Sequence, residues 1–266
     1  MKHKKLFITG VLCVLIGFVC CTIAYRVRGD SLLQYTEIRI GSESTLLLGR
    51  KTTNPFSGAH ETYAPAGNFT NYRIEADMAD IEIVKGERFT IETWNMPALG
   101  EKDDAVDWSE KKENGTYANT LRVQSKFAHN NFNARIRVTV PETISTLEIE
   151  NHLGTIALDH LSLADCHIEA DLGDVEVKDC RFVHSAFDLA MGSFDFEGMV
   201  KKRMKVDCAM GDADLVLQGK PEDYTIEADC DMGSVDIDGK ESHPYHGDAH
   251  VELDMSMGSV DIGFEE

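Results

Sequence analysis

Basic residues are scarce in this chain. Lysine and arginine together number 26 against 46 aspartates and glutamates in 266 residues, which gives a formal net charge of −20 and an isoelectric point near 4.8. Basic patches with interleaved aromatic residues, the usual footprint of nucleic-acid binding, are missing. Such an acidic protein repels anionic polymers and attracts cations or basic partners. We therefore expect no nucleic-acid partner.

Sequence motifs for catalysis are also absent. The chain has no Gly-x-Ser-x-Gly elbow, no P-loop, no His-Glu-x-x-His and no Rossmann glycine pattern. Carboxylates are plentiful, but a glycosidase pair needs a cleft and one raised pKa, which a sequence does not show. Carbohydrate cleavage stays a minor alternative because some β-solenoids degrade polysaccharides. We predict a protein that is not an enzyme, with no catalytic residue and no cofactor.

An uncharged apolar run lies near the start of the chain, at residues 6–25. Twenty helical residues, at about 1.5 Å each, match a hydrocarbon core of about 30 Å. A cleavable signal peptide has a shorter apolar stretch. We predict one transmembrane helix in an N-terminal anchor over residues 1–25, with removal or lipidation at Cys20 or Cys21 as the alternative.

The charges around this run favour one orientation. Three lysines precede it, at positions 2, 4 and 5, while Arg26 and Arg28 follow it. The positive-inside bias then puts the N-terminus in the cytoplasm and the C-terminal part outside. We predict a single-pass protein of the cell membrane. A stalk over residues 26–70, with short strands near 35–40 and 45–48, would lead to a β-repeat domain over residues 71–266.

A Leu/Met-Gly-Asp/Ser/Thr tripeptide recurs six times in the C-terminal half of the chain. Its glycines lie 19, 19, 19, 22 and 25 residues apart, at Gly154, Gly173, Gly192, Gly211, Gly233 and Gly258. A fixed period of this length is typical of repeat architectures. A first repeat begins near Tyr72, with Ala79 in place of the glycine.

Apolar and polar residues alternate on both sides of each glycine, as they do in half-buried strands. The apolar phase slips by one residue across the glycine, which indicates a bend there. We expect the Leu or Met before each glycine to be buried, and a hairpin meander would expose it. The sequence therefore predicts an all-β fold, a single-stranded β-solenoid (β-helix) of ~19-residue coils stacked in parallel.

Strands are also expected upstream of the regular repeats, at residues 89–94, 120–126 and 134–140. Residues 95–115 are interpreted as a charged loop that ends in the turn dipeptide Asn114-Gly115. Within the repeats, the strand pattern points Cys166, Cys208 and Cys230 inward and stacks the last two on adjacent coils. We expect these thiols and that of Cys180 to be free, because disulfide geometry between stacked neighbours is demanding.

An acid occurs four residues before every repeat glycine, and we call this set the first acid ladder. Its members are Glu150, Glu169, Asp188, Asp207, Asp229 and Asp254. A second acid ladder lies three residues after the glycine, where Ala157 is followed by Glu176, Asp195, Asp214, Asp236 and Asp261. Carboxylates about 4.8 Å apart repel each other, which favours a bound cation such as Ca²⁺. The alternative is a solvated face that keeps the protein soluble.

Three histidines form a second candidate metal site, at His243, His246 and His250. Their spacing suits a transition metal, although the segment contains Pro244 and Gly247 and is not helical. A polar loop that happens to be rich in histidine is the alternative interpretation. Neither candidate matches an EF-hand loop or the glycine-aspartate nonapeptide of calcium-binding β-rolls.

The repeats resemble a known bacterial family. The segment 136–141, Ile-Arg-Val-Thr-Val-Pro, leads into 147–156, Leu-Glu-Ile-Glu-Asn-His-Leu-Gly-Thr-Ile, and Gly-Asp/Ser-Val-Asp/Glu-Ile/Val then recurs. This pattern is similar to the β-strand-repeat domain of unknown function labelled "putative adhesin", over about residues 70–266. The resemblance implies an extracytoplasmic solenoid with membrane-anchored members, and it supplies no catalytic residues.

Three functional hypotheses follow. The first is a non-catalytic envelope module that binds a protein or a wall polymer, in adhesion or stress sensing. The second is a self-associating scaffold, which would form a homo-oligomer through the C-terminal edge strand, where only Glu265 and Glu266 guard the end. The third is a surface domain that binds divalent cations through the first acid ladder.

Overall fold

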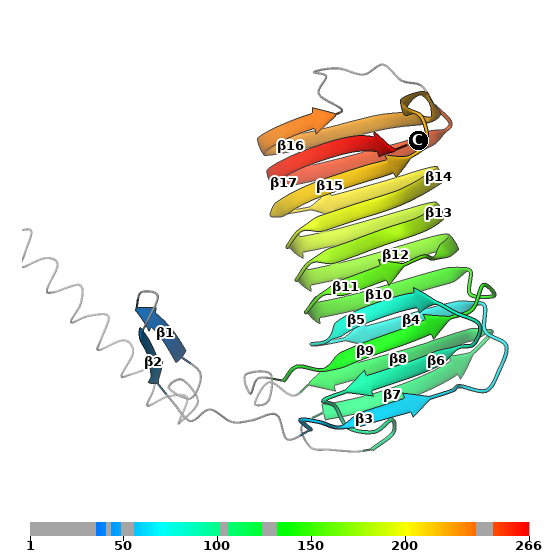
Figure 1. Cartoon of the computed structure of the whole chain (residues 1–266), viewed down its shortest axis with the longest axis vertical. Coiled ribbons are helices and arrows are strands. Elements are labelled where there is room, and N and C mark those ends of the chain that lie inside the picture. The colour runs from blue at the N-terminus through cyan, green and yellow to red at the C-terminus, as the bar shows by residue number, and fades with distance from the viewer. Residues whose placement is uncertain are drawn as a thin grey trace, which may run out of the picture. The chain divides into compact units, whose positions relative to one another are not determined.

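The structure is a computed structural model (Figure 1). It describes residues 56–101, 106–123, 132–237 and 247–265, together with the backbone of two strands, β1 (Thr36–Ile40) and β2 (Ser44–Leu48), which pair antiparallel. The predicted membrane anchor, including residues 6–25, lies outside the described residues. In the described part of the chain, no helix is long and apolar enough to cross a membrane.

The chain divides into two compact units, and the repeats belong to the second unit, residues 54–128 and 132–266. The described part of that unit is all-β apart from a 3₁₀ turn, η2 (Pro221–Asp223). Its strands are β3 (His60–Tyr63), β4 (Asn71–Ala76), β5 (Asp80–Lys85), β6 (Thr90–Trp94), β7 (Val106–Glu113), β8 (Thr116–Val123), β9 (Arg135–Val140), β10 (Thr146–Leu153), β11 (Ile156–Asp159), β12 (Ser162–Leu172), β13 (Val175–Met191), β14 (Phe194–Cys208), β15 (Gly211–Gln218), β16 (Tyr224–Ile237) and β17 (Ala249–Glu265).

These strands form one curled sheet (Figure 1). The sheet has two halves, made of different strand segments, which we call the pre-glycine face and the post-glycine face. The pre-glycine face contains the segments that precede each repeat glycine, in the order β7, β8, β4, β10, β12, β13, β14, β17, β16. The post-glycine face contains the segments that follow it, in the order β3, β6, β9, β5, β11, β13, β14, β15, β17, β16. The longest strands pass from one face to the other, so each contributes to both.

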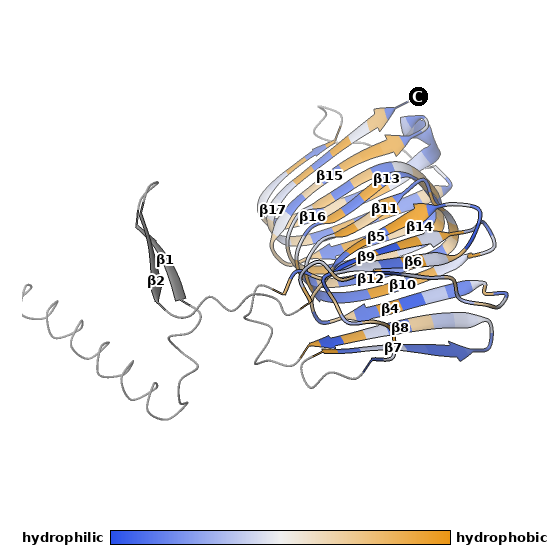
Figure 2. Cartoon of the chain, turned by 60° about the horizontal axis from the view of Figure 1, so that its bottom comes forward, coloured by the Kyte–Doolittle hydropathy of each residue, from blue (hydrophilic) through white to orange (hydrophobic). Residues whose placement is uncertain are grey.

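Consecutive repeats pair in parallel, as the period predicts. Ile149 lies opposite Ile168, which lies opposite Phe187, and each step is 19 residues along the chain. The inward-pointing apolar residues of β10 to β14 are buried, and Figure 2 shows the alternation of hydrophobic and hydrophilic residues along the strands. A half-buried strand needs this pattern, because successive side chains point to opposite faces.

The order of the last two strands differs from the order in the sequence. β17 pairs with β14 and β15 on one side and with β16 on the other, so it lies inside the stack. The prediction that the C-terminal strand forms the edge is therefore wrong, and β16 takes the last place instead. The predicted neighbours Cys208 and Cys230 are consequently separated by Met255, which faces both of them.

Part of the predicted 95–115 loop is a strand. β7 pairs antiparallel with β8, and the indole of Trp108 on β7 is fully buried. The turn between them is the predicted Asn114-Gly115 pair, whose φ angles of 49° and 78° suit a tight hairpin. The run of charged residues at positions 110–113 hid the strand, because it interrupts the alternation that Val106 and Trp108 begin.

The Leu or Met before each repeat glycine is exposed, which contradicts the expectation of burial. The six residues are 39% to 60% accessible, and they are Leu153, Leu172, Met191, Met210, Met232 and Met257. They lie at the corner between the two faces, where the phase slip turns the side chain outward. Parallel pairing is present even though the burial argument that favoured it was wrong.

The corner glycines are required by close backbone approach. Gly192 has φ +148°, and a Cβ on it would lie 2.0 Å from the carbonyl oxygen of Gly173. The same approach joins Gly173 to Gly154, and Gly154 to the carbonyl of Ala79. Ala79 therefore takes the place of the glycine in the first repeat, as predicted. At Gly154, Gly173 and Gly192 a Cβ would collide with the backbone of the preceding corner, so only glycine fits at these three positions.

Aspartates after alternate glycines join one corner to the next. Asp174 Oδ1 accepts hydrogen bonds from the backbone N–H and the hydroxyl of Ser193, at 2.8 and 2.9 Å. Asp212 does the same for Ser259, at 2.9 and 2.7 Å. The alternation of acid and hydroxyl residues satisfies corner donors and avoids placing like charges next to each other at this position.

Candidate functional site

The first acid ladder is a continuous column on the pre-glycine face. In spatial order its carboxylates belong to Glu150, Glu169, Asp188, Asp207, Asp254 and Asp229. Glu75 of β4 lies opposite Glu150 and extends the column, which sequence reasoning missed. The order of the last two acids is reversed relative to the sequence because β17 lies inside β16. All six predicted residues are thus brought together.

Cations in a neighbouring column neutralise part of this ladder. The guanidinium of Arg73 lies 2.8 Å from Glu75 and 4.0 Å from Glu150. The ammonium of Lys205 lies 2.5 Å from Asp207. Both basic residues stand two positions before the ladder acid on the same strand, so they point to the same face. The pre-glycine face therefore carries much of its own charge compensation.

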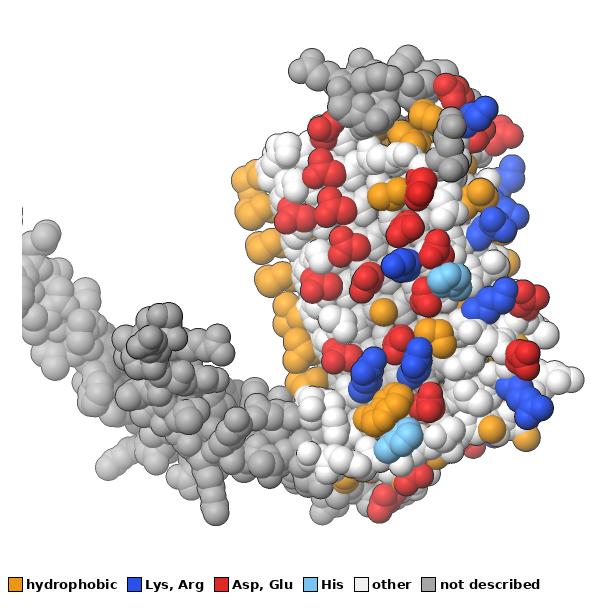
Figure 3. All heavy atoms as spheres, in the orientation of Figure 1, with side chains coloured by type: hydrophobic (Ala, Val, Ile, Leu, Met, Phe, Trp, Pro, Cys, Tyr) orange, Lys and Arg blue, Asp and Glu red, His pale blue; other side chains and the backbone are white. Residues whose placement is uncertain are grey.

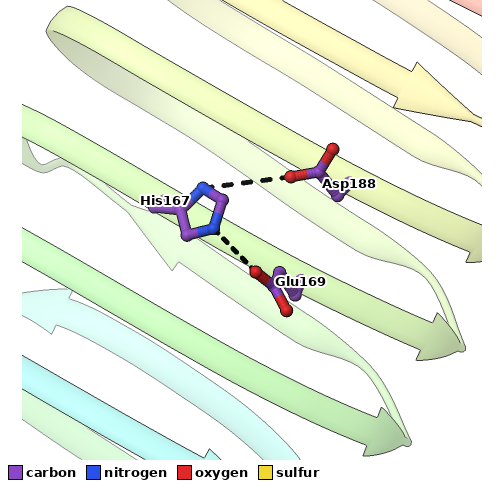
Figure 4. Close-up of side chains that lie close together, drawn as sticks. All are labelled: His167, Glu169 and Asp188. Atoms are coloured by element: carbon purple, nitrogen blue, oxygen red, sulfur yellow. Dashed lines mark hydrogen bonds and ion pairs between the residues drawn. The ribbon is translucent and has the colours of Figure 1, made fainter.

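The imidazole of His167 lies between two neighbouring acids of the ladder (Figure 4). Its Nε2 lies 3.0 Å from Glu169 on the same strand, and its Nδ1 lies 4.0 Å from Asp188 on β13. The three ligand atoms lie within 4.8 Å of one another. Sequence reasoning did not single out His167, although its position two residues before a ladder acid was the available signal.

A shallow groove of about 460 Å³ runs along the first acid ladder. Its walls include the ladder acids Glu169, Asp188, Asp207 and Asp254. The pKa of Asp188 is raised above its ordinary value. The larger cause is partial burial, and the second is the neighbouring carboxylate of Asp207. The ionised form of Asp188 is therefore disfavoured, and a cation placed in the groove would relieve the repulsion.

The second acid ladder, on the post-glycine face, has less compensation. Within the described residues, no ion pair reaches Glu176, Asp195, Asp214 or Asp261, which lie in register on adjacent strands. The pKa of Asp214 is raised, mainly by partial burial and to a smaller extent by the charges of Asp195, Asp261 and Asp212. Partial burial and then the charges of Glu176 and Asp174 raise the pKa of Asp195. These four residues form an unneutralised acidic stripe.

The histidine candidate is only partly covered by the structure. His243 and His246 lie outside the described residues. His250 lies on β17 in register with Arg203 on one side and Thr225 on the other. The structure therefore brings no second predicted histidine to His250 in the part that it describes.

The repeat cysteines are free thiols inside the stack. Cys166, Cys180 and Cys208 are buried, and Cys230 on the terminal strand is partly exposed. Burial raises the pKa of the Cys166 thiol, and burial likewise raises that of Cys180, to about 12. Thiols held in the neutral form are poor nucleophiles and poor metal ligands, so these three serve as small apolar core residues.

The family of the chain follows from its repeat domain. The Toastrack DUF4097 family model matches residues 69–266. The chain belongs to this family. This assignment confirms the resemblance to the β-strand-repeat domain labelled "putative adhesin". The matched residues cover both faces of the stack and both acid ladders. They do not include the apolar run at residues 6–25.

Several solved structures are similar to this member of the Toastrack DUF4097 family. One is a "putative adhesin" from Bacteroides fragilis, with 10% identity, a TM-score of 0.41 and coverage of 78% of this chain and 98% of that one. Another is a "putative cell adhesion protein" from Clostridium sporogenes, with 14% identity, a TM-score of 0.39 and coverage of 79% and 100%.

A third is a "putative lipid binding protein" from Parabacteroides distasonis, with 12% identity, a TM-score of 0.29 and coverage of 79% and 98%. All three TM-scores are below 0.5, so the family assignment depends on the family model alone. No curated protein gives a significant match to the chain.

Proposed function

We propose that this protein is a non-catalytic binding module, anchored in the cell membrane, that presents acidic faces outside the cytoplasm to a protein or wall polymer. Envelope adhesion or stress sensing is the role that fits such a module. The observation that most directly supports this proposal is the second acid ladder, in which Asp195, Asp214 and Asp261 lie in register without an ion pair. A repeated like-charge penalty on an exposed face is relieved when a cationic partner binds.

The architecture supports a binding role. We infer that each repeat forms one coil of a β-solenoid, so that equivalent side chains recur at a regular spacing along the stack. Stacked repeats offer extended surfaces, which suit long or multivalent partners. The groove over the first acid ladder is open and shallow, and its walls are carboxylates and small side chains. Both features favour a polymer or a polypeptide over a small substrate.

Membrane topology is the test of the location. Lys111 on β7 is exposed, so Lys111→Cys gives an accessible thiol without disturbing the core. Intact cells that produce this variant should react with a membrane-impermeant maleimide, while cells with the wild-type chain give the matched control. Reaction only after lysis would place the domain in the cytoplasm and refute the envelope role.

Crosslinking in cells tests the binding itself. A photoreactive amino acid at Asp214, in the middle of the second acid ladder, should give a discrete crosslinked species. The same probe at Glu142, which lies on the loop after β9 and is paired with Lys85, is the control position. Equal crosslinking from both positions, or none from Asp214, would contradict a binding role for this face.

Divalent cation binding is the second candidate function, and the three ligand atoms at His167, Glu169 and Asp188 favour it. Carboxylates are the preferred ligands of Ca²⁺, and imidazole adds affinity for Zn²⁺. The melting temperature should rise with millimolar Ca²⁺ or with Zn²⁺ and fall again with chelator. His167→Gln should abolish the Zn²⁺ response alone. If neither Ca²⁺ nor Zn²⁺ changes the melting temperature, divalent cation binding is ruled out.

A further inference from the structure

Most of the exposed large hydrophobic side chains in the described part of the chain stand in one row. Eight such residues are exposed, and six of them precede the repeat glycines. We call this row the Leu/Met ridge. In spatial order it consists of Leu153, Leu172, Met191, Met210, Met257 and Met232. Figure 3 shows apolar side chains in a column along one edge of the stack, beside acidic side chains.

The ridge is straight and continuous because its residues are in register. Leu153 lies opposite Leu172, which lies opposite Met191, and Met257 lies opposite Met232. The N–H of Gly192 donates to the carbonyl of Met210 at 3.0 Å, which joins the two halves. Six strands about 4.8 Å apart give a ridge about 24 Å long. That length matches about four turns of an α-helix.

The fold does not require apolar side chains at this position. Each ridge residue points away from the core and is at least 39% exposed, so a polar side chain there would stay hydrated. Contiguous apolar surface on a soluble domain marks interaction sites, and methionine is common at adaptable binding surfaces. The ridge is therefore best explained by something that covers it.

Acidic side chains flank the ridge on both sides. Asp174 and Asp212 directly follow two of the corner glycines, and the second-ladder acids Glu176 and Asp214 stand two residues further along. The first acid ladder lies three residues before the ridge on the other face. A second copy of this chain would bring acid against acid on both sides, and an anionic membrane would be repelled in the same way.

We propose that the Leu/Met ridge is the docking surface for a basic amphipathic polypeptide segment. Its apolar side chains cover the ridge, and its lysines or arginines reach the carboxylates on either side. This assignment deepens the proposed binding function, since it names the chemistry of the partner, and it depends on that function for its biological setting. It does not depend on which side of the membrane the domain occupies.

The ridge methionines report binding directly. The full-length chain, labelled with ¹³C in its methionine methyl groups, is titrated with a 14-residue helical peptide of leucine and lysine. The methyl signals of Met191 and Met210 should shift saturably, while those of the buried Met204 and Met255 stay in place. A peptide with glutamate in place of each lysine should give no shift.

Two variants complete the test. Met191→Gln combined with Met210→Gln should weaken binding of the basic peptide at least tenfold. Val216→Gln changes an exposed apolar residue outside the ridge and should leave the affinity unchanged. Unchanged affinity in the double variant would overturn the proposal, because the peptide would then bind the acid ladders alone. Binding of the acidic peptide with equal affinity would also overturn it.

Other occupants of the ridge give different results. Concentration-dependent dimers of the full-length chain that disappear in the double variant would assign the ridge to a second copy. Ridge-dependent binding to vesicles of anionic lipid would assign it to a membrane surface. Either result overturns the proposed partner. The crosslinking at Asp214 asks whether the acidic face has a partner in cells, whereas the methionine variants ask whether the purified chain binds a basic peptide through the ridge, so the two failures are distinguishable.

Discussion

Replacement of Gly192 by alanine should destabilise the repeat stack severely. The added Cβ would lie 2.0 Å from the carbonyl oxygen and 2.6 Å from the carbonyl carbon of Gly173. Both belong to backbone that is hydrogen-bonded in the stack, so neither yields cheaply. A strained φ costs about 1–3 kcal/mol, and forced separation of packed groups costs about 1–3 kcal/mol more. We expect a loss of about 2–6 kcal/mol in the free energy of unfolding, out of about 5–15 kcal/mol for a typical domain.

Two control variants separate the causes. Gly263→Ala has no heavy atom within 4 Å of the new Cβ and no left-handed φ, so it should leave the stability almost unchanged. Gly58→Ala has φ +87° and an equally open surrounding, so it isolates the cost of the backbone conformation. That cost is about 1–2 kcal/mol for an L-residue.

Thermal unfolding followed by circular dichroism is the assay. About 1 kcal/mol shifts the melting temperature of a domain of this size by about 2–4 °C, so Gly192→Ala should lower it by about 4–24 °C. Gly58→Ala should lower it by only about 2–8 °C. Equal shifts for Gly192→Ala and Gly58→Ala would refute the close-approach argument, since the φ angle alone would then explain the glycine column.

Two further predictions concern charge and thiols. Asp214→Asn should raise the free energy of unfolding in urea melts by about 1 kcal/mol at low salt, because unit charges about 4.8 Å apart repel by about 0.9 kcal/mol even in bulk water. The control variant Glu142→Gln should give no such gain. A gain for Asp214→Asn that survives 1 M salt would contradict the reasoning. The raised pKa of Asp214 means that the wild type loses stability as the pH rises through it, and the variant should not. Cys166 and Cys180 should react with a thiol reagent at pH 8 only after unfolding, because burial raises both pKa values; rapid labelling of the folded chain would refute this.

Alternation and period predicted the strands of the regular repeats, whereas the choice of parallel pairing depended on a burial argument that was wrong. Ile168 and Ala170 point inward before Gly173, and Val175 and Val177 point inward after it, as the phase slip requires. The same pattern did not reveal on which side of the chain the residue at the corner lies. Leu172 was expected inside because it is apolar, but apolar residues also occupy much of a protein surface. Hydrophobicity alone does not place a side chain at a corner.

The alternation of apolar and polar residues also could not predict the position of β17 in the sheet, because its pattern suits an inner strand and a terminal strand equally well. The spacing of the glycines held a signal that was not used. Gly211 stacks on Gly258, and Gly233 lies beyond it, so the chain passes over one level and then returns to fill it. Such a detour needs extra residues, and the last two intervals are 22 and 25 instead of 19.

The two acid ladders look alike in the sequence, but their neighbours make them different. Arg73 and Lys205 lie beside the first ladder together with the imidazole of His167, and a partner that binds there must compete with these groups. Asp214 on the second ladder has no such neighbour, so a cationic partner gains its full attraction there. Because the four acids of the unneutralised stripe lack such partners within the described residues, a basic amphipathic segment on the Leu/Met ridge should place its charged side chains toward the post-glycine face. Charge reversal by Asp214→Lys should therefore weaken binding of the leucine-lysine peptide more than Glu169→Lys does, and the opposite order would contradict this orientation.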